Sequence, residues 1–375
     1  MSKSRIRRWS ARRTAVMCST MLTICAGAAA HAQTMEVPVP PVRLALDERG
    51  ANLATGGYQL QTNAVAIGTN DTGMAFSLTK SGLVWTQPWR YAVYYVTGGV
   101  EVVVGTTTLN FNLVSGAYVN QQATGETLTA NPSGTAYTLT MRDGTIIYFD
   151  GSGGDPNAVA FHFYNKRAIA AANYILKPDG EKLTFRYKSL SYEGLQGWTS
   201  SLRVRSVTSS KGYMTKIEYV GSVFDNNWQK VAKVTLLNLG VDYCDPDADS
   251  CTGLTQTWPS MTFGESVAGA VTTRTETDTL GRVTTYTFDT TLRTTAIKRP
   301  SSATDNLVAT SDATGKISSI TANGVNWTYS WSLAAPNMTA TITDPNGGQR
   351  VYVTDTTTKR VTSFRDELNR TTSYT

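Results

Sequence analysis

The stretch from Asp278 to Asp289, DTLGRVTTYTFD, most constrains what this chain can fold into, because it returns in altered form downstream. Related segments open at Asp312, Asp344 and Asp366. Each begins with Asp, passes through Gly or Asn, adds a basic residue or a Gly-Gln-Arg step, and continues with β-branched or aromatic residues at period two. Asp accepts hydrogen bonds from nearby backbone, and Gly or Asn adopts a positive φ at little steric cost. Each copy therefore predicts a tight turn that leads into a β-strand.

A unit of one turn and one strand is too small to bury its own apolar face, so its repetition predicts stacking against neighbouring units. Upstream, DGTIIYFD (Asp143–Asp150) and PDGEKLTFRY (Pro178–Tyr187) follow the same turn-and-alternation pattern. Alanine clusters between Lys166 and Ile175 without a helical apolar stripe, which leaves helix, strand and loop open there. Tandem alternating strands predict an all-β fold of repetitive antiparallel hairpins that form a curved, spiralling sheet.

The pattern D-x-x-G-R-x-T-x-Y-x-x-D resembles the YD repeat of the Rhs family. The matching residues are, in the first copy, Asp278, Gly281, Arg282, Tyr286 and Asp289; in the second copy, Asp344, Gly347, Arg350 and Tyr352; and in the third copy, Asp366, Arg370 and Tyr374. The second copy has two extra residues before Arg350, and the third carries Asn369 where the family usually has Gly. The segment from Leu46 to Gln61 also resembles the leader that precedes such repeats in secreted bacterial members.

The resemblance implies a β-sheet that spirals into a hollow shell, as in insecticidal toxin complexes, polymorphic toxins and teneurins. In the toxin members, the shell encloses a C-terminal effector. We interpret residues 33–265 as an Rhs-type, β-rich leader domain and residues 266–375 as YD repeats, the last of them truncated. The chain is then expected to be the N-terminal portion or a truncated member of a wall-associated or polymorphic-toxin-like protein. Its partner would be the remainder of the shell or an effector.

The first 32 residues have the organisation of a cleaved signal peptide. A basic stretch that includes Arg12 and Arg13 precedes an apolar run from Ala15 to Ala30, and Ala30-His31-Ala32 gives an A-x-A cleavage site. The apolar run is short for a spanning helix, which needs roughly 20 residues. We therefore expect export of the mature chain to the periplasm, the cell surface or the medium.

The charge balance changes once this segment is removed. It carries Lys3 and five arginines but no acidic residue, so it accounts for the whole formal net charge of +6. A neutral mature chain gives no reason to expect a nucleic-acid partner or an anionic membrane surface. The mature chain also has no apolar run of transmembrane length.

The mature chain has two cysteines, Cys244 and Cys251, in VDYCDPDADSCTGL. In an oxidising compartment this spacing predicts a local disulfide. The alternative is a calcium loop, since Asp245, Asp247 and Asp249 occupy alternate positions. An EF-hand loop, however, needs Gly where Ser250 stands and a bidentate Glu later, so we favour the disulfide.

The sequence gives little support for an enzyme or for a cofactor. The mature chain has one histidine, His162, and GESVA (Gly264–Ala268) lacks the last Gly of the nucleophile elbow. Without clustered histidines or cysteines, no metal site is expected. Complete Rhs proteins carry D-P-x-G motifs at an autoproteolytic core, but for Asp344–Gly347 we favour a plain turn with Pro at its second position. We therefore predict a structural protein without catalytic activity.

The aromatic residues suggest a second function. Trp327, Tyr329 and Trp331 alternate, which places three aromatic rings on one face of a strand. Such a face could stack on sugars, so the alternative function is a cell-surface glycan-binding module. Packing in the core remains the favoured role for these side chains, because aromatic residues bury large areas in β-proteins.

Overall fold

The computed structural model describes residues 45–69, 73–81, 84–122, 124–151, 161–163, 166–194, 197–223, 225, 227–357 and 359–374. The predicted signal peptide lies outside these ranges, and so does the side chain of His162. Every regular element within them is a β-strand, which confirms the predicted all-β class. None of these residues forms a helix long and apolar enough to cross a membrane.

The N-terminal segment forms two small antiparallel sheets. The first contains β1 (Gln59–Gln61), β4 (Thr79–Ser81) and β5 (Val84–Thr86). The second pairs β2 (Val65–Ile67) with β3 (Met74–Phe76). We use the word leader below for residues 45–86, which carry these five strands.

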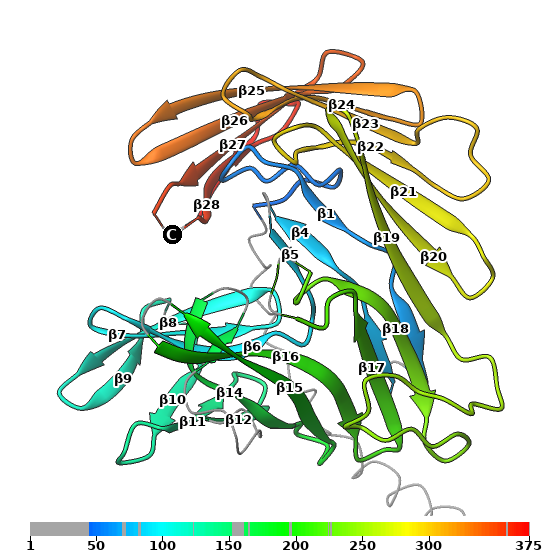
Figure 1. Ribbon diagram of the computed structural model, residues 1–375. Helices are drawn as coiled ribbons and strands as arrows, with labels where there is room; N and C mark the ends of the chain where they lie inside the picture. Colours follow the sequence, from blue (N-terminus) through cyan, green and yellow to red (C-terminus); the bar gives the residue numbers. More distant parts are fainter. Residues whose placement is uncertain are drawn as a thin grey trace, which may run out of the picture. The chain divides into compact units, whose positions relative to one another are not determined.

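The remaining strands form one large sheet in which consecutive strands pair antiparallel along most of the chain. Figure 1 shows these consecutive strands lying side by side. The strands of the first half are β6 (Tyr91–Val96), β7 (Gly99–Val104), β8 (Thr107–Val114), β9 (Ala117–Asn120), β10 (Thr127–Ala130), β11 (Ala136–Thr140), β12 (Ile146–Asp150), β13 (Phe161–Phe163) and β14 (Lys166–Leu176). Strand β14 pairs with β12 and also with β6, so the pairing from β6 to β14 closes on itself.

The sheet then continues from β14 to the last described strand by neighbour-to-neighbour antiparallel pairing. Its further strands are β15 (Lys182–Gly194), β16 (Gly197–Ser209), β17 (Tyr213–Tyr219), β18 (Val231–Asn238), β19 (Ser260–Ala268), β20 (Val271–Asp278), β21 (Val283–Phe288), β22 (Thr294–Lys298), β23 (Leu307–Ser311), β24 (Ile317–Ala322), β25 (Val325–Ala334), β26 (Asn337–Thr343), β27 (Gln349–Asp355), β28 (Val361–Arg365) and β29 (Thr371–Ser373). Strand β19 crosses the predicted boundary between residues 265 and 266 and pairs with both β18 and β20. The sheet is therefore continuous at that position.

The alanine-rich segment, for which sequence left helix, strand and loop open, is strand β14. Ala170, Ala171 and Ala172 have no exposed surface and belong to the main core. Here β6 and β12 lie on opposite edges of β14, and small side chains pack well in such a crowded position. Packing with neighbouring strands thus overrides the helical preference of alanine.

The core follows the period-two alternation of the strands. The largest apolar cluster joins residues of β2, β3 and β6 to β8 with residues of β10 to β12 and β14 to β19, among them Tyr94, Phe149 and Phe185. A second cluster joins Ala51 and Leu53 of the leader to β23–β26, and a third joins Leu60 to Tyr286 and Phe288. The inward face of the repeat hairpins is therefore covered by the leader.

Candidate functional site

The repeat motif that begins at Asp278 forms a five-residue turn between β20 and β21. The Asp278 N–H donates to the Arg282 carbonyl (3.1 Å), and the Gly281 N–H donates to the Asp278 carbonyl (3.0 Å). One carboxylate oxygen of Asp278 accepts the N–H groups of Leu280 and Arg282, both at 2.9 Å. The other accepts the Arg282 Nε–H at 2.7 Å. With a φ of 72°, Gly281 takes the left-handed conformation that favours glycine.

The same turn recurs at the three copies predicted downstream, whereas the upstream segments form turns that open at Met141 and Lys177 and carry Asp in the third position. In each copy the first residue is Asp, its carboxylate accepts two backbone N–H groups, and the fourth residue has a positive φ. These turns open at Asp278, Asp312, Asp344 and Asp366, with Gly281, Gly315, Gly347 and Asn369 in the fourth position. Asn369 has a φ of 62°, so asparagine occupies the glycine position as its tolerance of this region allows.

Two further copies of the turn were not predicted. Asp289, which sequence placed at the end of the first repeat, opens a turn of its own, and Arg293 Nε donates to its carboxylate at 2.8 Å. Its fourth residue is Leu292, with a φ of 58°. Asp47 opens the other copy in the leader, where its carboxylate accepts the Ala51 N–H at 2.7 Å. A pattern of Asp with Arg four residues later, without the requirement for Gly, would have found the turn at Asp289.

The Asp carboxylates of these turns are occupied by hydrogen bonds that hold the chain. Hydrogen bonding from the backbone of Arg282 lowers the pKa of Asp278, and the backbone of Arg370 does the same for Asp366. A carboxylate with a lowered pKa that already accepts three donors is a poor general acid or base. These repeat residues therefore shape the hairpins.

The segment Asp344–Gly347 forms a turn, as predicted, and joins β26 to β27. The fifth position here is Gly348, so Arg350 makes no pair with Asp344. Instead, Arg350 pairs with Glu367 and, at 3.1 Å, with Glu48 of the leader. The two extra residues before Arg350 therefore redirect its guanidinium from its own turn to two other segments. Ser266 of the GESVA segment lies within β19 opposite Thr273, and a strand interior is not a nucleophile elbow.

The motif tyrosines differ in their surroundings. Tyr286 is buried, and its hydroxyl donates to Glu276 at 2.9 Å. Glu276 is also buried and accepts the side-chain N–H of Asn63 at 2.7 Å, which ties the leader to β20. Burial raises the pKa of Glu276, although its hydrogen bonds oppose the increase. Tyr352 packs against Phe364 of β28, with their ring centres 4.8 Å apart. The backbone N–H of Tyr374 donates to the carbonyl of Thr362.

The three aromatic residues of the suggested glycan platform are in contact with other parts of the protein. The Tyr329 hydroxyl donates to Asp47, and the Arg49 guanidinium lies 3.9 Å from the centre of the Trp327 ring. The Trp331 Nε1–H donates to the carbonyl of Ile317 at 2.6 Å. Tyr329 is buried, and Trp327 and Trp331 are half-buried. The leader thus lies against the face that a sugar would need.

The segment between β18 and β19, residues 239–259, is a long loop that we call the disulfide loop. Cys244 and Cys251 are bonded in it, with their Cα atoms 5.4 Å apart, as predicted. Asp242 fixes the base of the loop, because its carboxylate accepts Trp258 Nε1–H (2.7 Å) and the hydroxyl of Thr255 (2.7 Å). Hydrogen bonds from the Thr255 hydroxyl, from the Trp258 side chain and from the backbone of Thr255 and Gln256 lower the pKa of Asp242 to about 2. The loop covers Met214 and Leu237 on the adjoining strands.

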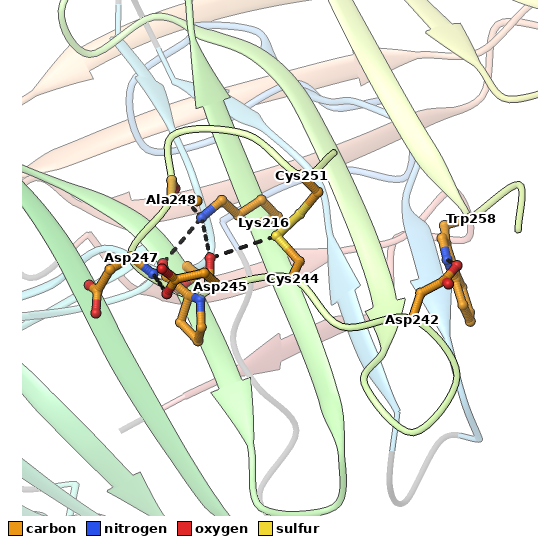
Figure 2. The surroundings of a disulfide bond; sticks show 10 residues. Lys216, Asp242, Cys244, Asp245, Asp247, Ala248, Cys251 and Trp258 are labelled. Atoms are coloured by element: carbon orange, nitrogen blue, oxygen red, sulfur yellow. Dashed lines mark hydrogen bonds between the residues drawn. A yellow bond between two sulfur atoms is a disulfide. The ribbon is translucent and has the colours of Figure 1, made fainter. Parts of the chain in front are cut away.

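The acidic run of this loop surrounds a lysine. The Lys216 ammonium, on β17, donates to the carbonyls of Asp245 and Pro246 (3.2 Å each) and to that of Ala248. Figure 2 labels Lys216 with Asp245 and Ala248. Burial lowers the pKa of Lys216 to about 8. Within the described residues, no group of three or more His, Cys, Asp or Glu side chains is placed to hold a metal ion. The loop carbonyls thus bind an ammonium group, and the alternate aspartates serve other partners.

Comparison with known proteins gives no family assignment. No family model matches the sequence, and no curated protein matches it. Among solved structures, the chain is similar to part of the crystal structure of TcdB2-TccC3, at 10% identity and a TM-score of 0.39, over 80% of this chain and 19% of that chain. It also matches a periplasmic gluconolactonase of Pseudomonas aeruginosa, PpgL, at 10% identity and a TM-score of 0.11, over 83% of this chain and 81% of that chain. The chain spans less than two thirds of the first of these structures, and neither similarity transfers a function.

Proposed function

We propose that this chain is an exported structural protein of the Rhs/YD-repeat type, which contributes β-sheet wall to a secreted or cell-surface assembly and performs no catalysis. One observation carries the proposal. The repeat motif residues build the same turn in hairpin after hairpin, and the leader covers the inward face of these hairpins. Residues that recur because each copy forms the same turn specify a repeating architecture.

The buried polar groups support a structural role. The carboxylates of Asp47 and Glu276, and the ammonium of Lys80, each bond a residue of another segment; the Lys80 Nζ, for instance, donates to the Leu292 carbonyl at 2.6 Å. Buried charges held in this way fix one arrangement of leader and hairpins. A role in intercellular competition follows from the resemblance of the motifs to polymorphic toxins and belongs to the same proposal.

Export is tested by sequencing the N-terminus of the protein that leaves the cell. We expect it to begin at Gln33, after the A-x-A site, while a variant that lacks residues 2–32 stays inside. Full-length chain in the cytoplasm of the native host would contradict the proposed export.

The structural role is tested by complementation of a deletion strain in mixed culture with its parent. We expect His162→Ala and Ser266→Ala to restore competitive fitness, because the proposal gives neither side chain a chemical role. Gly281→Val should restore it only in part, since a β-branched residue is strained at a φ of 72°. Loss of fitness with His162→Ala, in protein exported at normal amounts, would indicate an enzyme instead.

A further inference from the structure

A pocket of about 250 Å³ lies beside the disulfide loop, between that loop and strands β15 to β17. Its charged lining consists of three cations, Lys188, Arg203 and Arg205, and two carboxylates, Glu218 and Asp249. The structural role proposed above uses none of these side chains. Three cations around so small a volume indicate a ligand with a compact negative charge, since pockets for larger organic ligands are usually about 300–1,000 Å³.

Arg203 is fixed in place before any ligand arrives. Its NH1 group donates to the carbonyls of Gly221 and Trp228, both at 2.7 Å, and the guanidinium lies 3.7 Å from the centre of the Trp228 ring. The centre of the Tyr219 ring lies 4.4 Å from the same guanidinium, and only 6% of Arg203 is exposed. A rigid, desolvated guanidinium is well suited to bind an oxyanion, because little side-chain freedom is lost on binding.

Arg205 and Lys188 already hold an oxyanion supplied by the chain. The Asp249 carboxylate pairs with Lys188 Nζ and lies 3.3 Å from Arg205 NH2. The side chain of Asp249 is 62% exposed, so solvent and solutes reach it. Arg205 NH1 donates to the carbonyl of Asp247, and Arg205 Nε is buried without a hydrogen-bond partner among the described residues. The disulfide loop thus places one Asp249 oxygen against Lys188 and the other against Arg205. The Lys188 ammonium has three N–H donors, so this carboxylate does not use all of the donors of the two cations.

We propose that this pocket is an oxyanion-binding site, occupied internally by Asp249, and that an external sulfate or phosphate group competes with Asp249 for it. A tetrahedral oxyanion presents more acceptor oxygens than a carboxylate and can engage Lys188, Arg203 and Arg205 together. With Asp249 in place, three cations face two carboxylates; with Asp249 displaced or neutralised, they face Glu218 alone. Since the Cys244–Cys251 bond ends two residues beyond Asp249, it limits how far this carboxylate can withdraw.

The proposal is tested by isothermal titration of the folded protein with sodium sulfate, in buffers of constant ionic strength balanced with chloride. We expect Asp249→Asn to bind sulfate about tenfold more tightly than the wild type, because the competing carboxylate is gone. Adding Lys188→Gln to that variant should reverse the gain. Glu265→Gln is the matched control, since it removes a carboxylate that pairs with Lys230 at 2.6 Å, outside the pocket. Equal sulfate binding by all four proteins would overturn the proposal.

One further variant, a double substitution, tests the proposal without relying on correct folding of the Asp249→Asn protein. Cys244→Ser combined with Cys251→Ser releases the loop and should also tighten sulfate binding; no gain in a protein with native circular dichroism would contradict the competition with Asp249. A sulfated polysaccharide is titrated in parallel with inorganic sulfate and inorganic phosphate. Binding of the polysaccharide identifies an attached sulfate group as the ligand, and binding of the inorganic ions alone identifies a free ion; failure of all three probes would overturn the proposal.

Discussion

The phenolic hydroxyl of Tyr329, on β25, donates a 2.5 Å hydrogen bond to the carboxylate of Asp47, which lies 282 positions earlier in the chain. Both residues are buried, and Asp47 uses its other oxygen to close the first of the Asp turns. A single carboxylate therefore fixes a local turn in the leader and attaches that turn to a distant hairpin. The contact combines the two features that define this fold, the repeated turn and the covered inner face.

Replacing Tyr329 with Phe should lower the free energy of unfolding by about 1–3 kcal/mol, because the buried Asp47 oxygen loses its donor. Arg49 NH1 lies 3.6 Å from that oxygen, too far to replace the lost hydrogen bond. Urea unfolding followed by circular dichroism measures the change. Tyr95→Phe, at a position that is 71% exposed, is the control and should be neutral. Equal stability of the two variants would mean that the contact is not formed in solution.

In the turn that opens at Asp289, Leu292 has a positive φ, which is an unusual backbone conformation for leucine. With a φ of 58°, it holds the left-handed position that Gly or Asn fills in the other copies. Leu292→Gly should therefore raise the free energy of unfolding by about 0.5–1 kcal/mol, after the entropy of the more flexible unfolded chain is subtracted. The reciprocal change, Gly281→Leu, should be destabilising by a similar amount, since a Cβ at Gly281 meets no atom within 4 Å and only the backbone opposes it. Thermal unfolding of both variants tests the pair, and a destabilised Leu292→Gly protein would refute the argument.

The Asp turns and the Tyr329–Asp47 contact differ in how far the sequence can predict them. The Asp turn was predictable because its bonds lie within five residues, and the disulfide because its cysteines are close in sequence. The turn at Asp289 does not match the motif, because its fourth residue is Leu292 where the motif has Gly; the Asp289 carboxylate nevertheless accepts enough backbone N–H groups to hold this turn. The contacts of Asp47 with Tyr329 and of Asn63 with Glu276 depend on how the leader crosses the sheet, which no local pattern encodes. Likewise, the residues that neighbour Lys216 in sequence do not predict its hydrogen bonds to the carbonyls of the disulfide loop.

The disulfide should contribute about 2.5 kcal/mol to stability, the loop-entropy value for so short a closure. We therefore expect Cys244→Ser combined with Cys251→Ser to lower the free energy of unfolding by up to that amount, measured by denaturant titration. The wild type treated with a reductant should move to the same midpoint, while the double variant should not respond to the reductant. A reductant-insensitive wild type with free thiols would show that the bond does not form.

Lys216 should make stability depend on pH in the alkaline range. Burial lowers the pKa of Lys216 from 10.5 to about 8, so between these values the unfolded chain holds a proton that the folded protein has released. The unfolded state then binds more protons, and the free energy of unfolding rises with pH. Tyrosine ionisation in the unfolded chain opposes this near pH 10, because burial raises the pKa of residues such as Tyr91 to about 12. The increase is therefore expected between pH 8 and about 9.5.

Substitution identifies the group responsible for this increase. Lys216→Met removes the titrating amine and should reduce the slope of stability against pH in this window. It should not abolish the slope, since burial also lowers the pKa of Lys80 to about 8 and Lys80 titrates in the same direction. Lys298→Met, at an exposed position, should leave the slope unchanged. If Lys216→Met keeps the full wild-type slope, the ammonium is not enclosed by the carbonyls of the disulfide loop, because an amine in free contact with water would titrate alike in the folded and unfolded chain.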